Sequence, residues 1–328
     1  MTSRLYSFRE HLRKRFPFRV RKIGLDAGFT CPNRDGAKAT GGCVYCDNRS
    51  FSVNADSTDS VEQQIRQGIE AGRRKGIEHF LAYFQAYSNT YAPVVRLREI
   101  YAVALRFPEV VGVSVGTRPD CLSNAVLDLL SDLGKKTAVW LEIGLESGQD
   151  RSLVWMNRAH TVADFEAAIR RCDGRPFERV VHLIYGIPGE SHEEMMATTR
   201  FVASLPIDSV KVHHLYVAKD TPLESLYARG EVRLFTFEEW VPLASDIVER
   251  LPATMSIQRL CGELSNRWLV APRWEKSTPE VLRAVESELA RRGTRQGSLV
   301  PLRASAPVLE DRQVSQGKLQ GQERERGE

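Results

Sequence analysis

Residues 28–46 read GFTCPNRDGAKATGGCVYC and contain three of the six cysteines in this chain of 328 residues. Cys31, Cys43 and Cys46 have the spacing C-x11-C-x2-C and directly follow a predicted strand at Val20–Leu25. Two thiolates separated by two residues can bind one metal ion or one corner of a cluster, and a glycine-rich loop can bring back the third thiolate. Backbone N–H groups in such a loop can also donate to sulfur. The stretch therefore predicts a metal centre with three cysteine ligands.

The number of cysteine ligands helps to distinguish a zinc site from an iron–sulfur cluster. A structural zinc site normally has four closed ligands, and no fourth cysteine or histidine lies nearby, since the nearest histidines in sequence are His11 and His79. A [4Fe–4S] cluster held by three cysteines leaves one iron open. An open iron–sulfur site is therefore favoured, with zinc and unliganded thiols as the alternatives. The other cysteines, Cys121, Cys172 and Cys261, are expected to be core thiols because free cysteine behaves as a small apolar residue.

Composition excludes several classes of protein. Hydrophobic residues make up 42% of the chain and charged residues 27%, which excludes a wholly disordered or fibrous chain. No run of 18 apolar residues exists, so we expect no membrane span. The N-terminus has no apolar segment followed by a small-residue cleavage site, so we expect a cytoplasmic protein without a disulfide framework.

Short apolar or β-branched runs alternate with helical patterns along the chain. The expected strands are Val20–Leu25, Phe80–Gln85, Val110–Val115, Val139–Ile143, Val180–Tyr185, Val210–Tyr216 and Met255–Leu260. The expected helices are Ser60–Lys75, Pro93–Arg106, Ser123–Leu133, Thr161–Arg171, Ser191–Ser204 and Glu238–Leu251. This alternation favours βαβ units around a parallel sheet, either doubly wound or a complete or partial (β/α) barrel. In a barrel, the chemistry is expected at the C-terminal ends of the strands.

The two ends of the chain differ from its middle. Residues 1–22 contain eight basic residues and one acidic residue, interleaved with four aromatic residues. Such a basic arm is typical of a nucleic-acid surface, and the alternative is a solvated helix with aromatic anchors packed on the core. Residues 305–328 are polar and are expected to form a disordered tail. Between them we expect a core domain at 23–230 and, at 231–304, a C-terminal extension that completes the side of the barrel.

Several further motifs occur in a fixed order between about Lys22 and Gly297. They are CPNRDG, GGCVYC, YFQAYSNTYAP, GTRPDCL, LEIGLES, LIYGIPGE, VHHLYVAKDTPL and QRLCGE. With these motifs the chain resembles the radical S-adenosylmethionine (radical SAM) superfamily, and within it the group typified by the bacterial YhcC and YtqA proteins and related to the Elongator catalytic subunit. The long spacer between Cys31 and Cys43 departs from the commoner spacing C-x3-C-x2-C and is typical of this group. The resemblance implies a partial (β/α)6 barrel with a C-terminal extension.

The resemblance also implies the cofactors. Cys31, Cys43 and Cys46 look like the ligands of a [4Fe–4S] cluster, whose open iron would bind S-adenosylmethionine (SAM). One electron from a donor such as flavodoxin or ferredoxin would cleave SAM to methionine and a 5′-deoxyadenosyl radical. That radical would abstract a hydrogen atom from the substrate, while the protein positions the reactants and excludes water.

Other site residues follow where motifs align. Tyr45 occupies an aromatic position that often packs near adenine. LEIGLES resembles an element whose last residue holds the SAM ribose, which places Glu146 there, and a carboxylate suits a diol because it can accept two hydrogen bonds. Arg158 resembles an arginine that pairs with the SAM carboxylate, although it could instead cap the preceding helix. His182 stands where relatives often have aspartate near the ribose, and Gln85 replaces a glycine-rich turn near the methionine amino group.

Two further features of the strands bear on the site. Glu142 lies within a strongly apolar strand, where an unpaired carboxylate would be costly, so a functional role is favoured. His213 and His214 end another strand and should point to opposite faces, one of them toward the mouth of the barrel.

The resemblance points to tRNA as the substrate. Members of the group are tied to conversion of a carboxymethylaminomethyl group toward aminomethyl on the wobble uridine, and the segment Thr117–Asp120 (TRPD) also occurs in Elongator-like enzymes. The basic N-terminal segment is consistent with an RNA partner. The alternatives are a radical SAM enzyme that acts on a small metabolite or a protein, and a zinc-dependent nucleic-acid-binding protein without catalysis.

Overall fold

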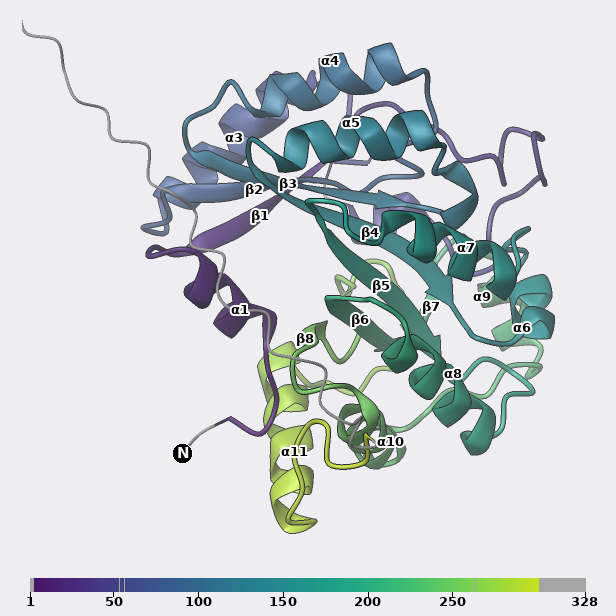
Figure 1. The fold of residues 1–328 in the computed structure, drawn as a ribbon. Coiled ribbons are helices and arrows are strands. Elements are labelled where there is room, and N and C mark those ends of the chain that lie inside the picture. Colours follow the sequence, from purple (N-terminus) through teal and green to yellow (C-terminus); the bar gives the residue numbers. More distant parts are fainter. Residues whose placement is uncertain (1–2, 53, 56, 263, 301–328) are drawn as a thin grey trace, which may run out of the picture.

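A computed structural model describes residues 3–300 except 53, 56 and 263, and its centre is one curled parallel sheet (Figure 1). The strands follow one another across the sheet in the order β1-β2-β3-β4-β5-β6-β8, and every neighbouring pair is parallel. Their bounds are β1 (Val20–Leu25), β2 (His79–Phe84), β3 (Val110–Thr117), β4 (Ala138–Glu146), β5 (Glu178–Tyr185), β6 (Ser209–His214) and β8 (Ser256–Arg259). The predicted partial barrel is therefore confirmed.

Six longer helices connect successive strands and lie on the outer side of the curled sheet (Figure 1). They are α3 (Val61–Arg73), α4 (Val94–Ala104), α5 (Asn124–Gly134), α7 (Val162–Cys172), α8 (His192–Ser204) and α10 (Phe237–Arg250). The side chains of Ser60, Ser123, Thr161 and Ser191 each accept a hydrogen bond from a backbone N–H in the first turn of the helix that follows. These caps fix where the helices begin.

Shorter elements, which the sequence pattern did not resolve, surround the C-terminal ends of the strands. They are α2 (Asn48–Phe51), the 3₁₀ helix η1 (Pro119–Cys121), α6 (Asp150–Trp155) and α9 (Pro222–Ala228), with β7 (Val217–Ala218) paired antiparallel to β9 (Leu269–Ala271). The expected strand Val210–Tyr216 therefore ends at His214, and the chain turns there. A final helix, α11 (Thr278–Arg291), packs against α10.

The basic N-terminal segment is folded against the sheet. Helix α1 (Phe8–Arg15) packs through Phe8 and Leu12 against Trp140 and its buried neighbours, near the N-terminal ends of the strands. Just before this helix, the backbone N–H of Ile257 in β8 donates to the carbonyl of Tyr6 at 2.8 Å. Of the two alternatives for this segment, the structure has the helix with aromatic anchors. Its exposed basic side chains lie at the end of the sheet opposite the polar strand exits.

The expected disordered tail at 305–328 lies outside the described residues. Among the residues described, no helix is long and apolar enough to cross a membrane.

Candidate functional site

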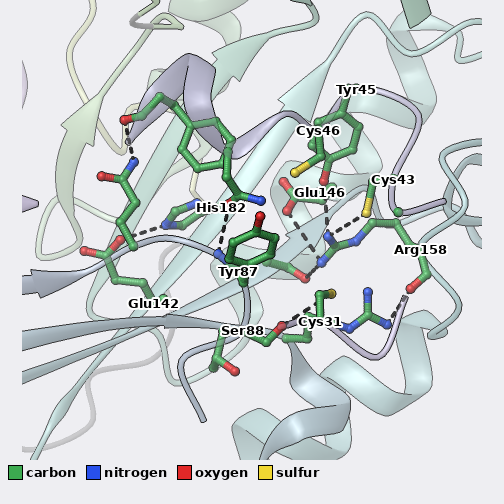
Figure 2. A pocket seen from close by; sticks show the side chains of 18 of the residues that line it. Cys31, Cys43, Tyr45, Cys46, Tyr87, Ser88, Glu142, Glu146, Arg158 and His182 are labelled. Carbon is green, nitrogen blue, oxygen red and sulfur yellow. Dashed lines mark hydrogen bonds and ion pairs between the residues drawn. The ribbon is translucent and has the colours of Figure 1, made fainter. Parts of the chain in front are cut away.

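One pocket lies at the C-terminal ends of the strands and gathers every site residue that the sequence predicted (Figure 2). The nine predicted side chains that line it are Cys31, Cys43, Tyr45, Cys46, Gln85, Glu142, Glu146, Arg158 and His182. They come from the loop after β1, from the end of β2, from the middle and end of β4, from the middle of β5, and from the segment after α6. The fold therefore brings together residues that are up to about half the chain apart in sequence.

The cysteine loop is shaped by short turns and glycines. The backbone N–H of Arg34 donates to the carbonyl of Cys31 at 2.8 Å, and that of Cys46 donates to the carbonyl of Cys43 at 3.0 Å. Gly42 has a φ of +79°, and a Cβ added there would lie 2.8 Å from Nε of Arg34. Glycine at this position therefore lets the loop close and bring the cysteines to one pocket.

Hydrogen-bond donors surround the sulfur atoms. Ser88 Oγ lies 3.5 Å from Cys31 Sγ, and Asn33 Nδ2 lies 3.4 Å from Cys43 Sγ. The Nη1 atom of Arg158 is 3.5 Å from the same Cys43 sulfur (Figure 2). Donors of this kind stabilise thiolates and the sulfurs of iron–sulfur clusters.

The donor set fits a cluster with three cysteine ligands. Burial raises the pKa of the Cys46 thiol to about 12, and the neighbouring Cys43 adds to the shift. A thiolate at this position therefore requires a strong positive partner, which the iron of a cluster supplies. Within the described ranges, no three histidine, cysteine, aspartate or glutamate side chains converge on a site for one metal ion. The three sulfurs instead line the wall of the pocket.

Glu146 and Arg158 occupy unusual backbone positions beside the cysteines. The ladder between β4 and β5 is irregular from Gly144 to Glu146, and Glu146 has a φ of +73°. Arg158 lies between two further residues with positive φ, Asn157 and Ala159. Non-glycine residues seldom adopt this conformation, and such strain concentrates at functional sites.

The Arg158 guanidinium is held in place by several groups of the protein. Nη2 donates to the carbonyl of Gly144 at 2.8 Å and lies 3.6 Å from a Glu146 carboxylate oxygen. Nη1 is also 3.2 Å from the Tyr45 hydroxyl, and Nε donates to His160 Nε2 at 3.2 Å. The side chain thus points into the pocket and does not cap the preceding helix. Its expected pairing with the SAM carboxylate stays a prediction.

Glu142 is the centre of a buried charged cluster deeper in the barrel. Its Oε1 accepts from Lys22 Nζ at 2.6 Å and from Ser114 Oγ at 2.5 Å. Its Oε2 accepts from Lys211 Nζ and lies 2.9 Å from His182 Nε2. Burial alone would raise the pKa of Glu142, but Lys211, Lys22 and His182 together hold this pKa well below its ordinary range. Glu142 is therefore ionised at neutral pH.

The remaining predicted residues also have defined positions. Burial, followed by the charge of Lys211, lowers the pKa of His182 to about 4, so this imidazole is neutral at pH 7. Gln85 Nε2 donates to the carbonyl of Phe51 at 3.2 Å. His213 lines the pocket, whereas His214 packs on Trp274 with ring centroids 3.9 Å apart. The predicted opposite orientation of the two histidines is therefore confirmed.

The sequence pattern missed several basic residues of the site, among them Arg118, Arg259 and Lys211. Arg118 and Arg259 line the pocket, and Lys211 reaches its floor through Glu142. A signal was present, because Lys211 and Arg259 are charged residues in strand segments that are otherwise mainly buried. A charge inside an apolar strand is costly unless it is paired or used.

Comparisons with known proteins agree with this architecture. Residues 34–202 match the family described as the radical SAM superfamily, and residues 207–291 match the radical SAM C-terminal domain. YtqA of Bacillus subtilis is 35% identical over 298 residues, which cover 90% of this chain and 92% of YtqA. YhcC of Escherichia coli is 34% identical over 264 residues, covering 80% of this chain and 85% of YhcC.

At lower sequence identity, the chain is also similar to parts of longer proteins. The solved structure of Elp3 from the archaeon Methanocaldococcus infernus, lacking its N-terminus, superposes with a TM-score of 0.65 at 18% identity. That match covers 84% of this chain and 64% of Elp3, so this chain spans just under two thirds of that protein. A tRNA uridine(34) acetyltransferase of Dehalococcoides mccartyi is 27% identical over 159 residues, 47% of this chain and 34% of the acetyltransferase.

These matches decide between the iron–sulfur enzyme and the zinc protein, two interpretations that the cysteine loop left open. The superfamily match covers half of the chain, and YtqA is similar over nearly its whole length. The alternative of a non-catalytic zinc protein is therefore wrong. The chain belongs to the radical SAM superfamily and is a radical SAM enzyme, with a [4Fe–4S] cluster and S-adenosylmethionine as its cofactors.

Proposed function

We propose that this radical SAM enzyme modifies the side chain of the wobble uridine in tRNA, converting a carboxymethylaminomethyl group toward aminomethyl. The observation that carries the proposal is the single pocket that joins the cysteine loop to the expected SAM-binding residues at the strand exits. Support for the RNA substrate comes from the relative named as a tRNA uridine(34) acetyltransferase, whose similarity covers 47% of this chain.

The predicted site residues that line the pocket have the following roles in this proposal. Cys31, Cys43 and Cys46 hold the cluster, Glu146 accepts hydrogen bonds from the SAM ribose, and Tyr45 packs near adenine. When bound, the cluster and SAM supply the chemistry that removes a hydrogen atom from the substrate. Arg158 donates to Cys43 and keeps the Glu146 carboxylate in place through its contacts with Gly144 and Glu146.

Gln85, Glu142 and His182 line the same pocket, and we propose that they border the SAM site. The neutral imidazole of His182 faces the Glu142 carboxylate. Since Glu142 already accepts from two lysines, it is better suited to orienting other groups than to binding the ribose directly.

The rim of the pocket offers a surface for RNA. Arg49 and Arg267 are exposed and both lie over the ring of Trp268, with guanidinium carbons 4.9 and 5.5 Å from its centroid. Arg34 is exposed and lies over Tyr87 at 5.7 Å. Arginine and aromatic side chains together bind phosphates and stack on unpaired bases. We therefore propose this rim, in preference to helix α1, as the RNA surface, because α1 lies at the opposite end of the strands.

The proposal also includes an electron donor and a location. The reductant is a flavodoxin or ferredoxin, and the protein acts in the cytoplasm, where tRNA is modified. The alternative within the same enzyme class is a small metabolite or a protein as the substrate.

The test is enzymatic conversion of tRNA in vitro. The reconstituted enzyme is incubated with SAM, a reductant and tRNA that carries carboxymethylaminomethyluridine, and the nucleosides are quantified by mass spectrometry. We expect loss of this nucleoside and gain of aminomethyluridine with the native chain and not with Cys46→Ala. Unchanged nucleosides, together with normal SAM cleavage, would point to the metabolite or protein alternative.

A further inference from the structure

The pocket has a second end, away from the cysteines, where basic side chains gather. Figure 2 shows Glu142 and His182 on one side of the pocket and Cys43 and Arg158 on the other, with Tyr87 between them. We use the name basic end for Lys22 of β1, Lys211 of β6 and Arg259 of β8; Arg259 lines the pocket, and the two lysines contact Glu142, which also lines it. In the pairing of β6 with β8, Lys211 and Arg259 are register partners, so the two charges lie on adjacent strands.

The one carboxylate at the basic end is fully occupied. Glu142 Oε1 accepts from Lys22 and Ser114, and Oε2 accepts from Lys211 and faces His182. A carboxylate offers about four acceptor positions, so Glu142 has none left for Arg259. At the other end of the pocket, Glu146 is directed to Arg158.

Arg259 is therefore a cation without a counter-charge. Nothing in the described part of the chain forms a hydrogen bond or ion pair with its guanidinium, although it lines the pocket and its Nε atom is buried. The neighbouring Gln258 has a buried Nε2 atom without an acceptor, while its Oε1 accepts from Lys22 at 2.9 Å. Buried donors without acceptors destabilise a folded protein, which indicates that they serve a ligand.

The charge of Arg259 lowers the pKa values of the histidines around it. After burial, which is the larger cause, Arg259 lowers the pKa of His214 to about 3. It also contributes to the lowered pKa values of His182 and His213. The basic end thus holds three basic side chains around one directly paired carboxylate, Glu142, and the charge of Arg259 also acts on the Glu146 carboxyl.

We propose that the basic end binds a carboxylate carried by the substrate, with Arg259 as its principal partner and Lys211 beside it. A guanidinium binds a carboxylate through two parallel hydrogen bonds, which fixes orientation as well as position. This inference rests on the proposed function, in which the modified group itself ends in a carboxylate. A carboxylate held here directs the adjoining carbon atoms of the substrate toward the cysteine end of the pocket.

SAM also carries a carboxylate, but a different donor is available for it. Arg118 lines the pocket, and its Nη2 donates to the carbonyl of Arg158 at 2.5 Å, which places it at the cysteine end. Its Nη1 atom is buried and has no acceptor. Asp120 accepts from the Nε and Nη2 atoms of Arg118, so Nη1 is the donor of this guanidinium left for a ligand. We expect the SAM carboxylate at the cysteine end, bound by Arg158 as the resemblance implies or by Nη1 of Arg118, which leaves Arg259 for the substrate.

The test compares two RNA ligands that differ in one group. One anticodon stem-loop carries carboxymethylaminomethyluridine, and the other carries its neutral carboxamide; both are titrated into the reconstituted full chain by fluorescence anisotropy. We expect the native chain to prefer the carboxylate by about tenfold or more, the range of a charged hydrogen bond. Arg259→Gln should bring the ratio close to one without changing affinity for the carboxamide, and Arg259→Lys should give an intermediate ratio.

Two controls separate folding and SAM binding from substrate recognition. Arg283→Gln, an exposed change on α11, should keep the native ratio. SAM affinity is measured for each variant by equilibrium dialysis and should be unchanged in Arg259→Gln. The inference is overturned if Arg259→Gln keeps the native ratio, or if that variant loses SAM affinity instead, since the ligand is then the carboxylate of SAM.

A third measurement keeps the inference testable if the RNA proposal fails. Binding of ¹³C-labelled acetate is followed by NMR in the native chain and in Arg259→Gln. If neither RNA binds but acetate binds only to the native chain, the tRNA proposal fails and the carboxylate site stands. If acetate binds equally well to both proteins, or to neither, the carboxylate site is refuted.

Discussion

Replacing Glu142 by glutamine removes the charge that holds two buried lysines in the barrel. The Glu142 side chain is fully buried, Lys211 is 8% exposed and Lys22 is 22% exposed. Glutamine keeps the shape of glutamate, so the change acts mainly through charge. It leaves Lys211 next to Lys22 in a site with little solvent to screen their repulsion.

The expected loss of free energy of unfolding in Glu142→Gln follows from the burial of Glu142 and its two lysine partners. Removing one partner of a buried ion pair costs about 3–5 kcal/mol, and Lys211, the less exposed lysine, carries most of this cost. Folded domains are stable by about 5–15 kcal/mol, so Glu142→Gln should remove a large part of the free energy of unfolding. Removing the stranded charge as well, in Glu142→Gln with Lys211→Met, should restore more than half of the loss.

The assay is equilibrium unfolding in urea, followed by tryptophan fluorescence. The matched control is Glu62→Gln, which removes a carboxylate whose partners, Arg66 and Arg106, are mostly exposed and which should therefore change the midpoint little. The reasoning is refuted if Glu142→Gln unfolds at the native midpoint. It is also refuted if the losses of the two single variants simply add in the double variant, because coupled charges must give a non-additive cycle.

Three further predictions concern the site, the histidines and the RNA surface. A Cβ added at Gly144 would lie 2.5 Å from a Glu146 oxygen and 2.8 Å from Arg158 Nη2, so Gly144→Ala should weaken SAM binding by about tenfold or more in equilibrium dialysis. The control is Gly24→Ala, where the added Cβ would lie 3.7 Å from its nearest neighbour and SAM binding should not change. Equal effects of the two substitutions would contradict this account. Burial, the largest cause in each case, lowers the pKa of His160 and His214 to about 3 and of His182 to about 4, from 6.5. Burial also lowers the pKa of His213, so near pH 5 the unfolded chain binds up to four more protons on these histidines. Stability should therefore fall as the pH drops from 6.5 to about 4, as urea midpoints across this range can test; midpoints independent of pH would show that these imidazoles are not buried. Arg267→Gln should lower the slope of log affinity for tRNA against log salt by about one, whereas Arg13→Gln on α1 should leave it unchanged; the reverse pattern would move the RNA surface to the N-terminal helix.

The sequence predicted the barrel well because its signals are local. Strands such as Ala138–Glu146 are buried on both faces and appear in the sequence as short, mainly apolar runs, and helix caps such as Ser60 and Thr161 mark where the helices begin. The cysteine loop was found for the same reason, since its three thiols lie within sixteen residues. These features require no knowledge of how distant segments meet.

What the sequence did not predict depends on contacts between distant segments. Helix α1 has a strongly basic sequence, and only the fold shows that Phe8 and Leu12 anchor it beneath the sheet. The partners of Glu142 lie on β1, β3, β5 and β6, so neither their number nor the unpaired state of Arg259 can be inferred from spacing. The contacts of Arg158 depend on a β-bulge and on positive φ angles that leave no sequence signature.

The most direct test of the central claim is the formation of 5′-deoxyadenosine from SAM. The chain is reconstituted with iron and sulfide without oxygen, reduced with dithionite and analysed by chromatography, alongside Cys43→Ala and the core variant Cys172→Ala. The account predicts 5′-deoxyadenosine from the native chain and from Cys172→Ala, and none from Cys43→Ala. Equal formation by Cys43→Ala and the native chain, or a native chain that builds no cluster and retains stoichiometric zinc, would contradict the assignment of Cys31, Cys43 and Cys46 as cluster ligands.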